Sequence, residues 1–315
     1  MTTPENTADH LLLGCMGLGG SWDTTPFTSA DIDAAQAAVE AALDSGITTF
    51  DHADIYRHGK AEAVFGEVLA RSAGLRERIT LQSKCGIRLA EGDRPGLYDL
   101  RASSIVRRVE ESLQRLRTDT LDVLLLHRPD PLADPADVAD ALTSLHRQGL
   151  VRRFGVSNMN AAQIARLQAH MNLPLVANQL EMSLHRRAWL EDAVLVNTAE
   201  SAANGFPAGT VEHCLNNGIE LQAWGALAQG RYTGAAEHPQ ETATLVAKLA
   251  EAKGTTPETI VLWWLRRHPA GIKPVIGTSN PQRIRACRDA AKLTPDLSHD
   301  EWYNLWISAR GTALP

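Results

Sequence analysis

The chain alternates short apolar, β-branched stretches with longer amphipathic or alanine-rich stretches along almost its whole length. From residue 48 onward, strand-like stretches occur at 48–51, 79–84, 121–127, 151–157, 175–180, 219–224 and 273–277. Helix-like stretches lie between them, at 29–43, 60–72, 101–116, 134–148, 160–170, 210–217 and within 240–268. An opening strand within 11–20 completes eight. Alternation of this kind requires a parallel sheet, so the sequence predicts an α/β fold, a single-domain (β/α)8 TIM barrel over residues 1–315.

Two other arrangements of the same elements are less consistent with the chain. The glycines of 14–20 do not fit Gly-x-Gly-x-x-Gly, so a dinucleotide-binding turn is not expected there. A doubly wound sheet has one crevice at a switch point, whereas polar residues here recur at the end of strand after strand. No linker or charge block divides the chain into two domains. The barrel is therefore favoured.

Local signals set the expected ends of several elements. Ser29 or Asp31 is expected to cap the first helix and Gly46 to stop it. Residues 298–310 read as a capped C-terminal helix that packs on the barrel, and residues 1–10 as a disordered N-terminus.

Composition excludes several partners. The formal net charge of −6 is spread along the chain without a basic stripe, which argues against nucleic acid and anionic membranes. The apolar runs are too short to span a bilayer, and the first ten residues form no apolar signal core. Four cysteines are scattered without a Cys-x-x-Cys pair. We expect a soluble, cytoplasmic monomer with free thiols that acts on a small molecule.

Ionisable side chains stand at the carboxyl ends of three predicted strands. Asp51 ends the run from Thr48, Lys84 ends the next strand, and His127 ends the one after; Tyr56 follows Asp51 by five residues. In a barrel these ends share one rim, where active sites form. An ammonium beside a phenol stabilises phenolate and lowers a pKa that is otherwise about 10. Tyr56 could then donate a proton, with Asp51 holding Lys84 and His127 bonding a carbonyl oxygen. Any one of these residues alone would better be read as a rim ion pair or a core histidine; the four together favour catalysis.

These four residues resemble the catalytic tetrad of the aldo-keto reductases. The strings Phe50-Asp-His-Ala-Asp-Ile-Tyr56 and Leu125-Leu-His-Arg-Pro-Asp130 look like that family's own. Further matches, in the family's order, are Gly155-Val-Ser-Asn158, Asn178-Gln-Leu-Glu181 and Gly277-Thr-Ser-Asn-Pro-Gln-Arg283. The resemblance covers about residues 12–290 and points to bacterial NADP-dependent enzymes of the branch that includes the potassium-channel beta subunits. It implies reduction of an aldehyde or ketone with hydride from NADP(H).

The resemblance also implies where the cofactor lies. Ser157, Asn158 and Gln179 match the positions that bind the nicotinamide carboxamide, and Trp224 the ring that stacks on it. Taken singly, Trp224 is more often core and Ser157-Asn158 a helix cap. The remaining implied contacts are Gly20, Ser21, Trp22, Gly225, Ala226, Leu227, Gln229, Gly230, Arg231, Ile276, Gly277, Thr278, Ser279, Gln282 and Arg283.

The end of the last predicted strand suggests a preference for NADP over NAD. A helix amino end with free N–H groups, two hydroxyls and Arg283 suits a 2′-phosphate. One charge is missing, since Gly277 replaces a lysine often found at the start of this motif.

The loops around the expected hydride position should form the substrate pocket. Its predicted residues are Trp22, Ile55, Ile87, Arg128 and Met182. Arg128 could bind an acidic substrate, or could equally be paired with Asp130 or the loop backbone. The stretch 193–209 is longer than usual for the family, and reads as a lid or pocket wall or as surface decoration.

Three other functions use the same residues differently. Lys84 could form a Schiff base, as in an aldolase-like barrel. Asp51, His52, Asp54 and His127 could bind a metal, although the His-x-His that barrel sites prefer is missing, and no metal is expected. A barrel could also bind the cofactor and report its redox state with little turnover. Stoichiometric metal, borohydride trapping at Lys84, or tight cofactor binding without turnover would identify these cases.

Overall fold

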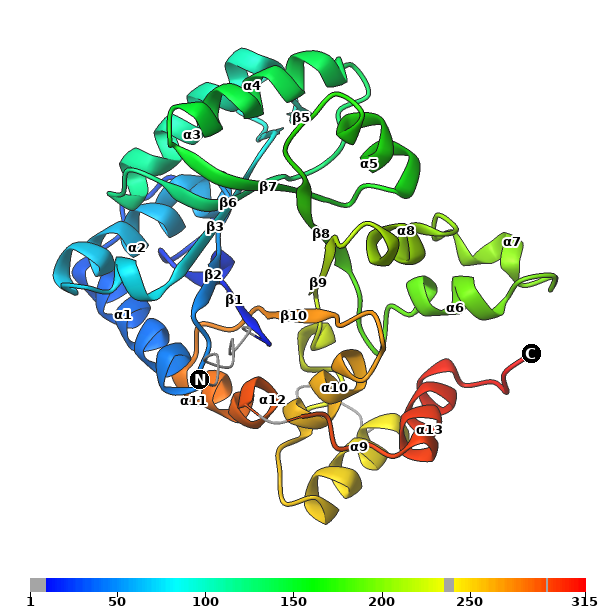
Figure 1. The fold of residues 1–315 in the computed structure, drawn as a ribbon. Helices are drawn as coiled ribbons and strands as arrows, with labels where there is room; N and C mark the ends of the chain where they lie inside the picture. Colours follow the sequence, from blue (N-terminus) through cyan, green and yellow to red (C-terminus); the bar gives the residue numbers. More distant parts are fainter. Residues whose placement is uncertain (1–9, 235–240, 293) are drawn as a thin grey trace, which may run out of the picture.

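The computed structural model describes residues 10–234, 241–292 and 294–315. Within them, eight parallel strands close into a barrel in the order β1-β10-β9-β8-β7-β6-β3-β2, with helices outside them (Figure 1). The strands are β1 (Leu12–Gly14), β2 (Thr49–Asp51), β3 (Thr80–Cys85), β6 (Leu121–Leu126), β7 (Val151–Ser157), β8 (Leu175–Glu181), β9 (Glu220–Trp224) and β10 (Lys273–Ile276). The predicted (β/α)8 barrel is confirmed. The predicted disorder of residues 1–10 falls almost wholly outside the described residues.

The helices connect consecutive strands and cover the barrel. They are α1 (Ser29–Asp44), α2 (Lys60–Arg71), α3 (Ala102–Leu116), α4 (Pro135–Arg147), α5 (Ala161–Gln168), α8 (Thr210–Asn216), α9 (Glu241–Ala252) and α10 (Pro257–Arg266). Helix α1 is capped by Thr28, whose hydroxyl accepts from the N–H of Asp31 while the Asp31 carboxylate accepts from the N–H of Thr28. The predicted caps Ser29 and Asp31 were thus wrong as caps, although Asp31 completes a capping box with Thr28.

The predicted helical stretch 240–268 is two helices. Helix α9 ends at Ala252, Gly254 has a positive φ of 63°, and Thr256 caps α10 by accepting from the N–H of Thr259. Pro257 occupies the first position of α10, where its missing N–H costs nothing. A cap followed by proline begins a new helix, and the largely apolar sequence of both helices conceals this break.

Several smaller elements were not predicted. The hairpin of β4 (Ile87–Arg88) and β5 (Leu97–Tyr98) follows β3. Helices α6 (Ala188–Val194) and α7 (Ser201–Asn204) lie in the long segment after β8. Helix α12 (Arg288–Lys292) follows α11 (Pro281–Ala286), which is the short helix that was expected after β10.

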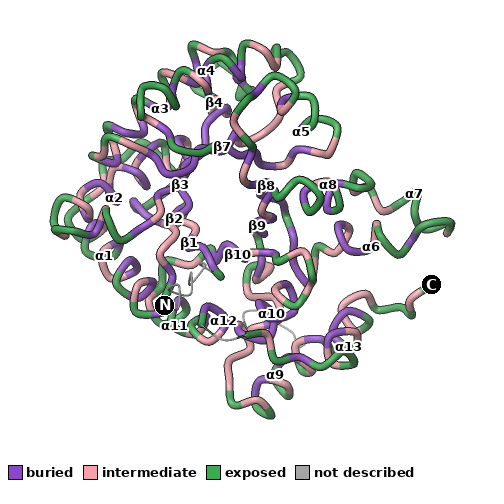
Figure 2. Tube along the Cα trace, in the orientation of Figure 1, coloured by how far each residue is buried: buried purple, intermediate pink, exposed green. Residues whose placement is uncertain are grey.

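The core lies mainly between the barrel and the helices, and the helices that cover the barrel turn buried residues toward it (Figure 2). Helix α13 (His299–Arg310) packs on this layer, capped by Ser298 with Glu301 as predicted. Trp302 of α13 stacks on Trp264 of α10 at 5.3 Å between ring centroids, and each indole N–H donates to the other residue's carbonyl oxygen. In the described part of the chain, no helix is long and apolar enough to cross a membrane.

Candidate active site

An ion pair between the ends of β2 and β3 forms the centre of the site. Lys84 Nζ lies 2.8 and 2.7 Å from the two carboxylate oxygens of Asp51 and 2.9 Å from the His52 carbonyl oxygen. Asp51 and Lys84 are only 2% and 1% exposed. Burial lowers the pKa of Lys84, but the Asp51 carboxylate and the Tyr56 hydroxyl outweigh it, so the pKa is raised. Lys84 is therefore held as an ammonium.

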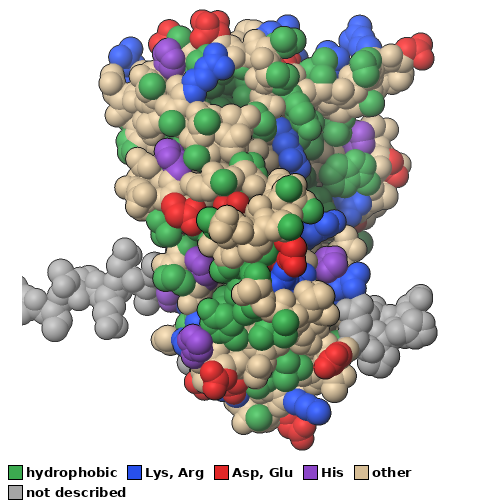
Figure 3. Space-filling model, turned by 90° about the vertical axis from the view of Figure 1, so that its right-hand side faces the viewer, with side chains coloured by type: hydrophobic (Ala, Val, Ile, Leu, Met, Phe, Trp, Pro, Cys, Tyr) green, Lys and Arg blue, Asp and Glu red, His purple; other side chains and the backbone are tan. Residues whose placement is uncertain are grey.

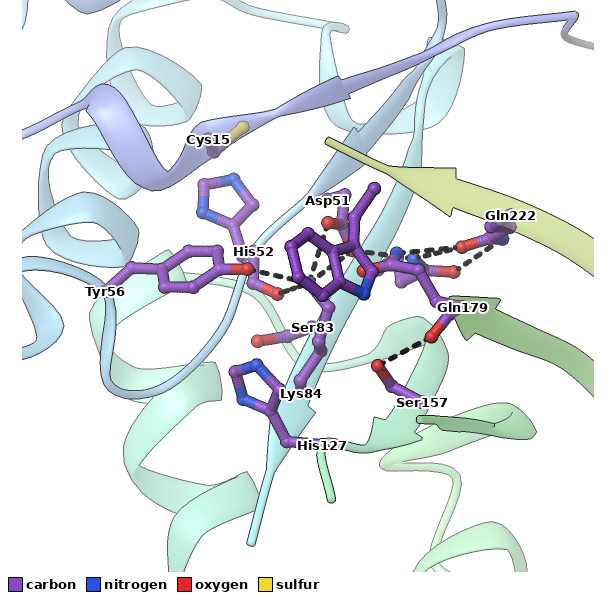
Figure 4. Close-up of polar contacts among 12 residues, drawn as sticks. Cys15, Asp51, His52, Tyr56, Ser83, Lys84, His127, Ser157, Gln179 and Gln222 are labelled. Atoms are coloured by element: carbon purple, nitrogen blue, oxygen red, sulfur yellow. Dashed lines mark hydrogen bonds and ion pairs between the residues drawn. The ribbon is translucent and has the colours of Figure 1, made fainter. Parts of the chain in front are cut away.

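Tyr56 meets this pair from the short helix η2 (Tyr56–Gly59) that follows β2. Lys84 Nζ donates to the Tyr56 hydroxyl at 3.1 Å, so one ammonium joins the carboxylate and the phenol (Figure 4). Burial raises the pKa of Tyr56, and Lys84 offsets this only in part. The expectation of a lowered pKa was therefore wrong for the protein without ligands: desolvation outweighs the ammonium.

His127 follows β6 on the adjoining side of the rim. Its backbone N–H donates to the Cys85 carbonyl oxygen at 2.8 Å, and its ring stands edge-on to Tyr56 with the centroids 6.0 Å apart. Burial, with the positive charges of Lys84 and Arg128, lowers the pKa of His127 to about 3. The imidazole is thus neutral at physiological pH. Its Nδ1 is buried and has no hydrogen-bond partner among the described residues.

The predicted carboxamide-binding residues form a connected group at the ends of β7, β8 and β9. The Ser157 hydroxyl donates to the Gln179 carbonyl oxygen at 2.9 Å and accepts from the Asn158 side-chain amide at 2.7 Å. The indole N–H of half-buried Trp224 donates to Asn158 Oδ1 at 3.2 Å. Asn158 has a positive φ of 57°, and the cap of α5 is Asn160. Asn158 therefore bonds other residues of the rim and does not cap α5.

Two buried glutamines below this rim were missed from the sequence. Gln82 of β3 and Gln222 of β9 bond each other reciprocally, at 2.9 and 3.1 Å. Gln82 also donates to Asp51 at 2.6 Å, and Gln179 donates to Gln222 Oε1 at 3.0 Å. A signal was present: Gln82 shares its strand parity with Lys84, so both face the barrel interior.

The loop after β9 lies beside Trp224. Gly225 and Gln229 are exposed with positive φ of 68° and 55°, while Ala226 is buried. Gly20, Ser21 and Trp22 are exposed on the loop after η1 (Cys15–Gly17). Among the remaining predicted contacts, Ala226 and Ile276 have buried side chains, Leu227, Gly230 and Arg231 are half-buried, and Gly277 and Gln282 are exposed.

The amino end of α11 differs from the expectation of free N–H groups. Asn280 Oδ1 accepts from the N–H groups of Gln282 and Arg283, at 2.9 and 3.2 Å, and Pro281 has none to offer. Thr278 Oγ1 accepts from the N–H of Asn280 at 3.2 Å. That part of the prediction was wrong, because an N-cap side chain already occupies the helix end. The exposed hydroxyl of Ser279 and the exposed guanidinium of Arg283 remain open.

The predicted substrate-pocket residues differ in how far they are exposed. Trp22 is 43% exposed beside the rim, with the Arg57 guanidinium 5.4 Å from its ring. Ile55, Ile87 and Arg128 are half-buried, whereas Met182 is fully buried in the main core. Met182 therefore supports the wall from behind and does not line the pocket.

The geometry bears on two of the alternative chemistries. Among the described residues, no three His, Cys, Asp or Glu side chains gather as metal ligands would. Lys84 makes four contacts and is held protonated, whereas a Schiff base needs an unprotonated amine.

Comparisons with known proteins agree with the barrel fold and with the family resemblance. The model of the Aldo/keto reductase family matches residues 10–305. The oxidoreductase YcsN of Bacillus subtilis is 36% identical over 302 residues, covering 94% of each chain. A 6-dehydroglucose reductase of Agrobacterium fabrum is 35% identical over 311 residues, covering 96% of this chain and 94% of its own. A solved glycerol dehydrogenase of Gluconobacter oxydans has the same fold, with a TM-score of 0.76, 22% identity, and 97% and 94% of the two chains covered. An aldo/keto reductase of Klebsiella pneumoniae in complex with NADP and acetate has a TM-score of 0.71 at 24% identity, covering 97% and 92%.

Proposed function

The chain belongs to the aldo/keto reductase family, and we propose that it reduces an aldehyde or ketone to an alcohol with NADPH. The observation that carries the proposal is the position of Lys84 Nζ, which bonds both the Asp51 carboxylate and the Tyr56 hydroxyl. An ammonium in that place stabilises the phenolate that remains after Tyr56 gives up its proton. Asp51 in turn keeps the ammonium charged and fixed.

The residues present suit a nicotinamide. Gln179 Oε1 accepts no hydrogen bond from any described residue, although this side chain is buried. A free acceptor on a side chain that is only 2% exposed suits the amide N–H of a carboxamide, and Asn158 Oδ1 has a second lone pair. Trp224 is placed to stack on the ring. When bound, NADPH supplies the hydride that the carbonyl carbon receives.

Protein groups handle the proton that the carbonyl oxygen receives. We assign the proton donor to Tyr56 and a supporting hydrogen bond to the neutral ring of His127. Because His127 has a pKa of about 3, it stays uncharged throughout the physiological range and orients the oxygen without competing as an acid. The product alcohol then carries one hydride and one proton more than the carbonyl compound.

We propose that NADPH is preferred over NADH. The support is Arg283, whose exposed guanidinium follows the exposed Ser279 and the half-buried Thr278 in the turn after β10. A guanidinium bonds a phosphate through two parallel N–H groups. Because Asn280 occupies the N–H groups of α11, this preference would depend on side chains.

We also propose a cytoplasmic monomer. All four cysteines are buried and unpaired, which suits a reducing compartment. Light scattering during size-exclusion chromatography would measure the mass, and a dimer at assay concentrations would overturn the monomer.

Replacement of Tyr56 by Phe tests the reaction. The ring is kept and the proton is lost, so carbonyl reduction should fall by about two or more orders of magnitude while NADPH affinity stays within about twofold. Initial rates on a panel of aldehydes and ketones, including a 6-dehydroglucose, would be read by NADPH absorbance. Tyr98→Phe on the exposed β5 strand is the matched control. Near-normal turnover in the Tyr56→Phe enzyme would refute the assignment.

A further inference from the structure

A cavity of about 870 Å³ opens beside the catalytic rim. Its inner end is lined by Arg128, next to His127, and by Asn158; its outer walls come from α6, α7 and the C-terminal segment at Arg310. Figure 3 shows the face that carries these elements, with a recess flanked by Lys and Arg side chains. The long segment after β8 is therefore a wall of this cavity. The volume holds a molecule much larger than a simple two-carbon aldehyde.

Arg128 differs from the other arginines of this cavity in having no partner among the residues that the structure describes. Arg187 Nε lies 3.1 Å from Glu191, Arg186 lies 3.5 Å from Glu181, and Arg310 pairs with acidic residues of the α6–α7 wall. No side chain or carbonyl group of the described residues bonds the half-buried guanidinium of Arg128.

The alternative partner of Arg128 is engaged elsewhere. The two oxygens of Asp130 accept from the N–H groups of Leu100 and Leu132, at 3.0 and 2.9 Å. A half-buried cation with no partner among the described residues, one residue from His127, suits the binding of an anion.

The anion is not a cofactor phosphate. Residues 225–231, which by family resemblance match the pyrophosphate-binding loop, follow β9, and the predicted 2′-phosphate site follows β10, whereas Arg128 follows β6. In the barrel order, β8 and β7 lie between β9 and β6. Arg128 thus lies on the side of the rim away from both phosphate sites.

We propose that the physiological carbonyl substrate carries a carboxylate, which Arg128 binds while the reacting carbonyl lies at Tyr56 and His127. This inference rests on the proposed reductase function and names its substrate class. Fixing the far end of the substrate orients the near end, so the carboxylate should raise kcat/KM.

Matched pairs of aldehydes test the inference: butanal against 4-oxobutanoate, and hexanal against 6-oxohexanoate, at saturating NADPH. We expect the wild-type enzyme to favour the carboxylate in at least one pair. Arg128→Gln should reduce that preference about 10- to 150-fold, the scale of a charge-assisted pair. Because Arg128 has no partner to strand, the variant should fold. Arg186→Gln, at the exposed edge of the same cavity, should keep the preference.

The possible outcomes distinguish this inference from the proposed reductase function on which it rests. Reduction of both members of each pair without preference for the carboxylate, or an Arg128→Gln enzyme that keeps the preference, overturns the inference alone. A neutral sugar aldehyde used better than every carboxylate would do the same. Failure to reduce any aldehyde overturns the reductase function, and the inference with it.

A second inference concerns the glutamines below the rim, and it rests on the hydrogen bonds between them. Each side-chain amide has one nitrogen and one oxygen end, and a carboxylate accepts only. Asp51 therefore fixes the Gln82 nitrogen toward itself, and Glu220, which accepts from Gln222 at 2.9 Å, fixes the Gln222 nitrogen. Glu220 is held in turn by Lys273 at 2.6 Å.

With both glutamines so fixed, only one orientation of Gln179 is satisfied. Gln222 Oε1 is an acceptor, so Gln179 must present its nitrogen to it, and the Gln179 oxygen is left free. We infer that Gln82 and Gln222 are positioning residues that aim the Gln179 oxygen at the cofactor's carboxamide N–H. This inference also presumes the proposed NADPH function, but it is tested by binding.

Calorimetric titration with NADP⁺ and with its 3-acetylpyridine analogue, in which a methyl group replaces the amide nitrogen, tests this relay. The wild-type protein should bind NADP⁺ more tightly, by roughly two- to tenfold, the scale of a neutral hydrogen bond. The double variant Gln82→Leu with Gln222→Leu removes both glutamines at once, so that neither amide is left buried without the other. It should lose the discrimination while still binding the analogue. Retained discrimination, or equal weakening of both ligands, would show that the glutamines are merely structural.

Discussion

The rim at β2 and β3 and the turn after β10 are both proposed contact sites, yet they are built in opposite ways. At the rim, Asp51 and Lys84 are buried and every proton donor of the ammonium is used within the protein. At the turn, Ser279 and Arg283 are exposed, and the internal bonds are those of the Asn280 cap. The Lys84 ammonium is thus fully hydrogen-bonded within the protein, whereas the Arg283 guanidinium faces solvent.

This difference follows from what each region must do. A group that stabilises a transition state acts best when its surroundings are fixed beforehand, because no reorganisation is then needed during the reaction. A surface that binds and releases a charged cofactor needs a cation whose desolvation cost is small. We therefore expect rim substitutions to affect turnover and folding together, and turn substitutions to affect cofactor affinity alone.

Lys84→Met should have the largest effect. It leaves the Asp51 carboxylate buried and unpaired, which should lower the free energy of unfolding by about 3–5 kcal/mol. Turnover should fall as well, and the alkaline limb of any remaining activity should move to higher pH, because Lys84 partly lowers the pKa of Tyr56. Urea denaturation and a pH–rate profile measure the two effects. Full stability with an unshifted limb would mean that the rim is not the rigid unit described.

Arg283→Ala should have an intermediate effect confined to the cofactor. NADPH binding should weaken by about 1.5–3 kcal/mol, the scale of a charge-assisted hydrogen bond, with NADH and stability nearly unchanged. Arg285→Ala on the same helix, also exposed, is the control. Equal losses for both cofactors in a fluorescence titration would show that Arg283 does not contact the 2′-phosphate.

His52 gives the rim a pH dependence that the turn lacks. Burial, with Lys84 nearby, lowers the pKa of His52 from 6.5 to about 3, and neither ring nitrogen has a partner among the described residues. Between those values the unfolded chain binds a proton that the folded protein does not. This contribution to stability is complete above pH 6.5 and is lost as the pH falls toward 3.

His52→Leu should remove the His52 share of this slope, up to about 1.4 kcal/mol per pH unit within this window, while the share of His127, whose pKa is also about 3, should remain. Denaturation at pH 7 and pH 5 would compare the variant with the wild-type protein. Arg283→Ala should leave the pH slope as it was. An unchanged slope in His52→Leu would place the acid sensitivity elsewhere.

The sequence predicted the barrel well because a β-branched run and a helical run alternate with few interruptions. It predicted the tetrad because strand ends in a parallel barrel share one rim, so Asp51, Lys84 and His127 had to be neighbours. The pKa of Tyr56 could not be predicted in this way, since it depends on the balance between burial and one ammonium. Gln82 and Gln222 were missed because the two residues, which bond each other, are 140 residues apart in sequence.

The surface beyond the rim was much less predictable. The hairpin of β4 and β5 uses strands of two residues each, too short for an alternating pattern. Near Thr28 and Asn280, several Ser, Thr, Asn and Asp side chains could each serve as the helix cap. Only the backbone geometry decides which of them does so. Arg128 remained ambiguous until the two oxygens of Asp130 had been accounted for.

The stacked pair of Trp264 and Trp302 makes the docking of the C-terminal helix visible by optical means. Two indoles 5.3 Å apart, held by reciprocal hydrogen bonds, should couple their electronic transitions and give a near-ultraviolet circular dichroism signal. Trp224, one of the seven tryptophans, lies at the proposed cofactor site, where its indole N–H bonds Asn158, and its fluorescence should report cofactor binding. Two spectra of one sample could thus follow the C-terminal helix and the cofactor separately, and Trp302→Phe should abolish only the dichroic signal.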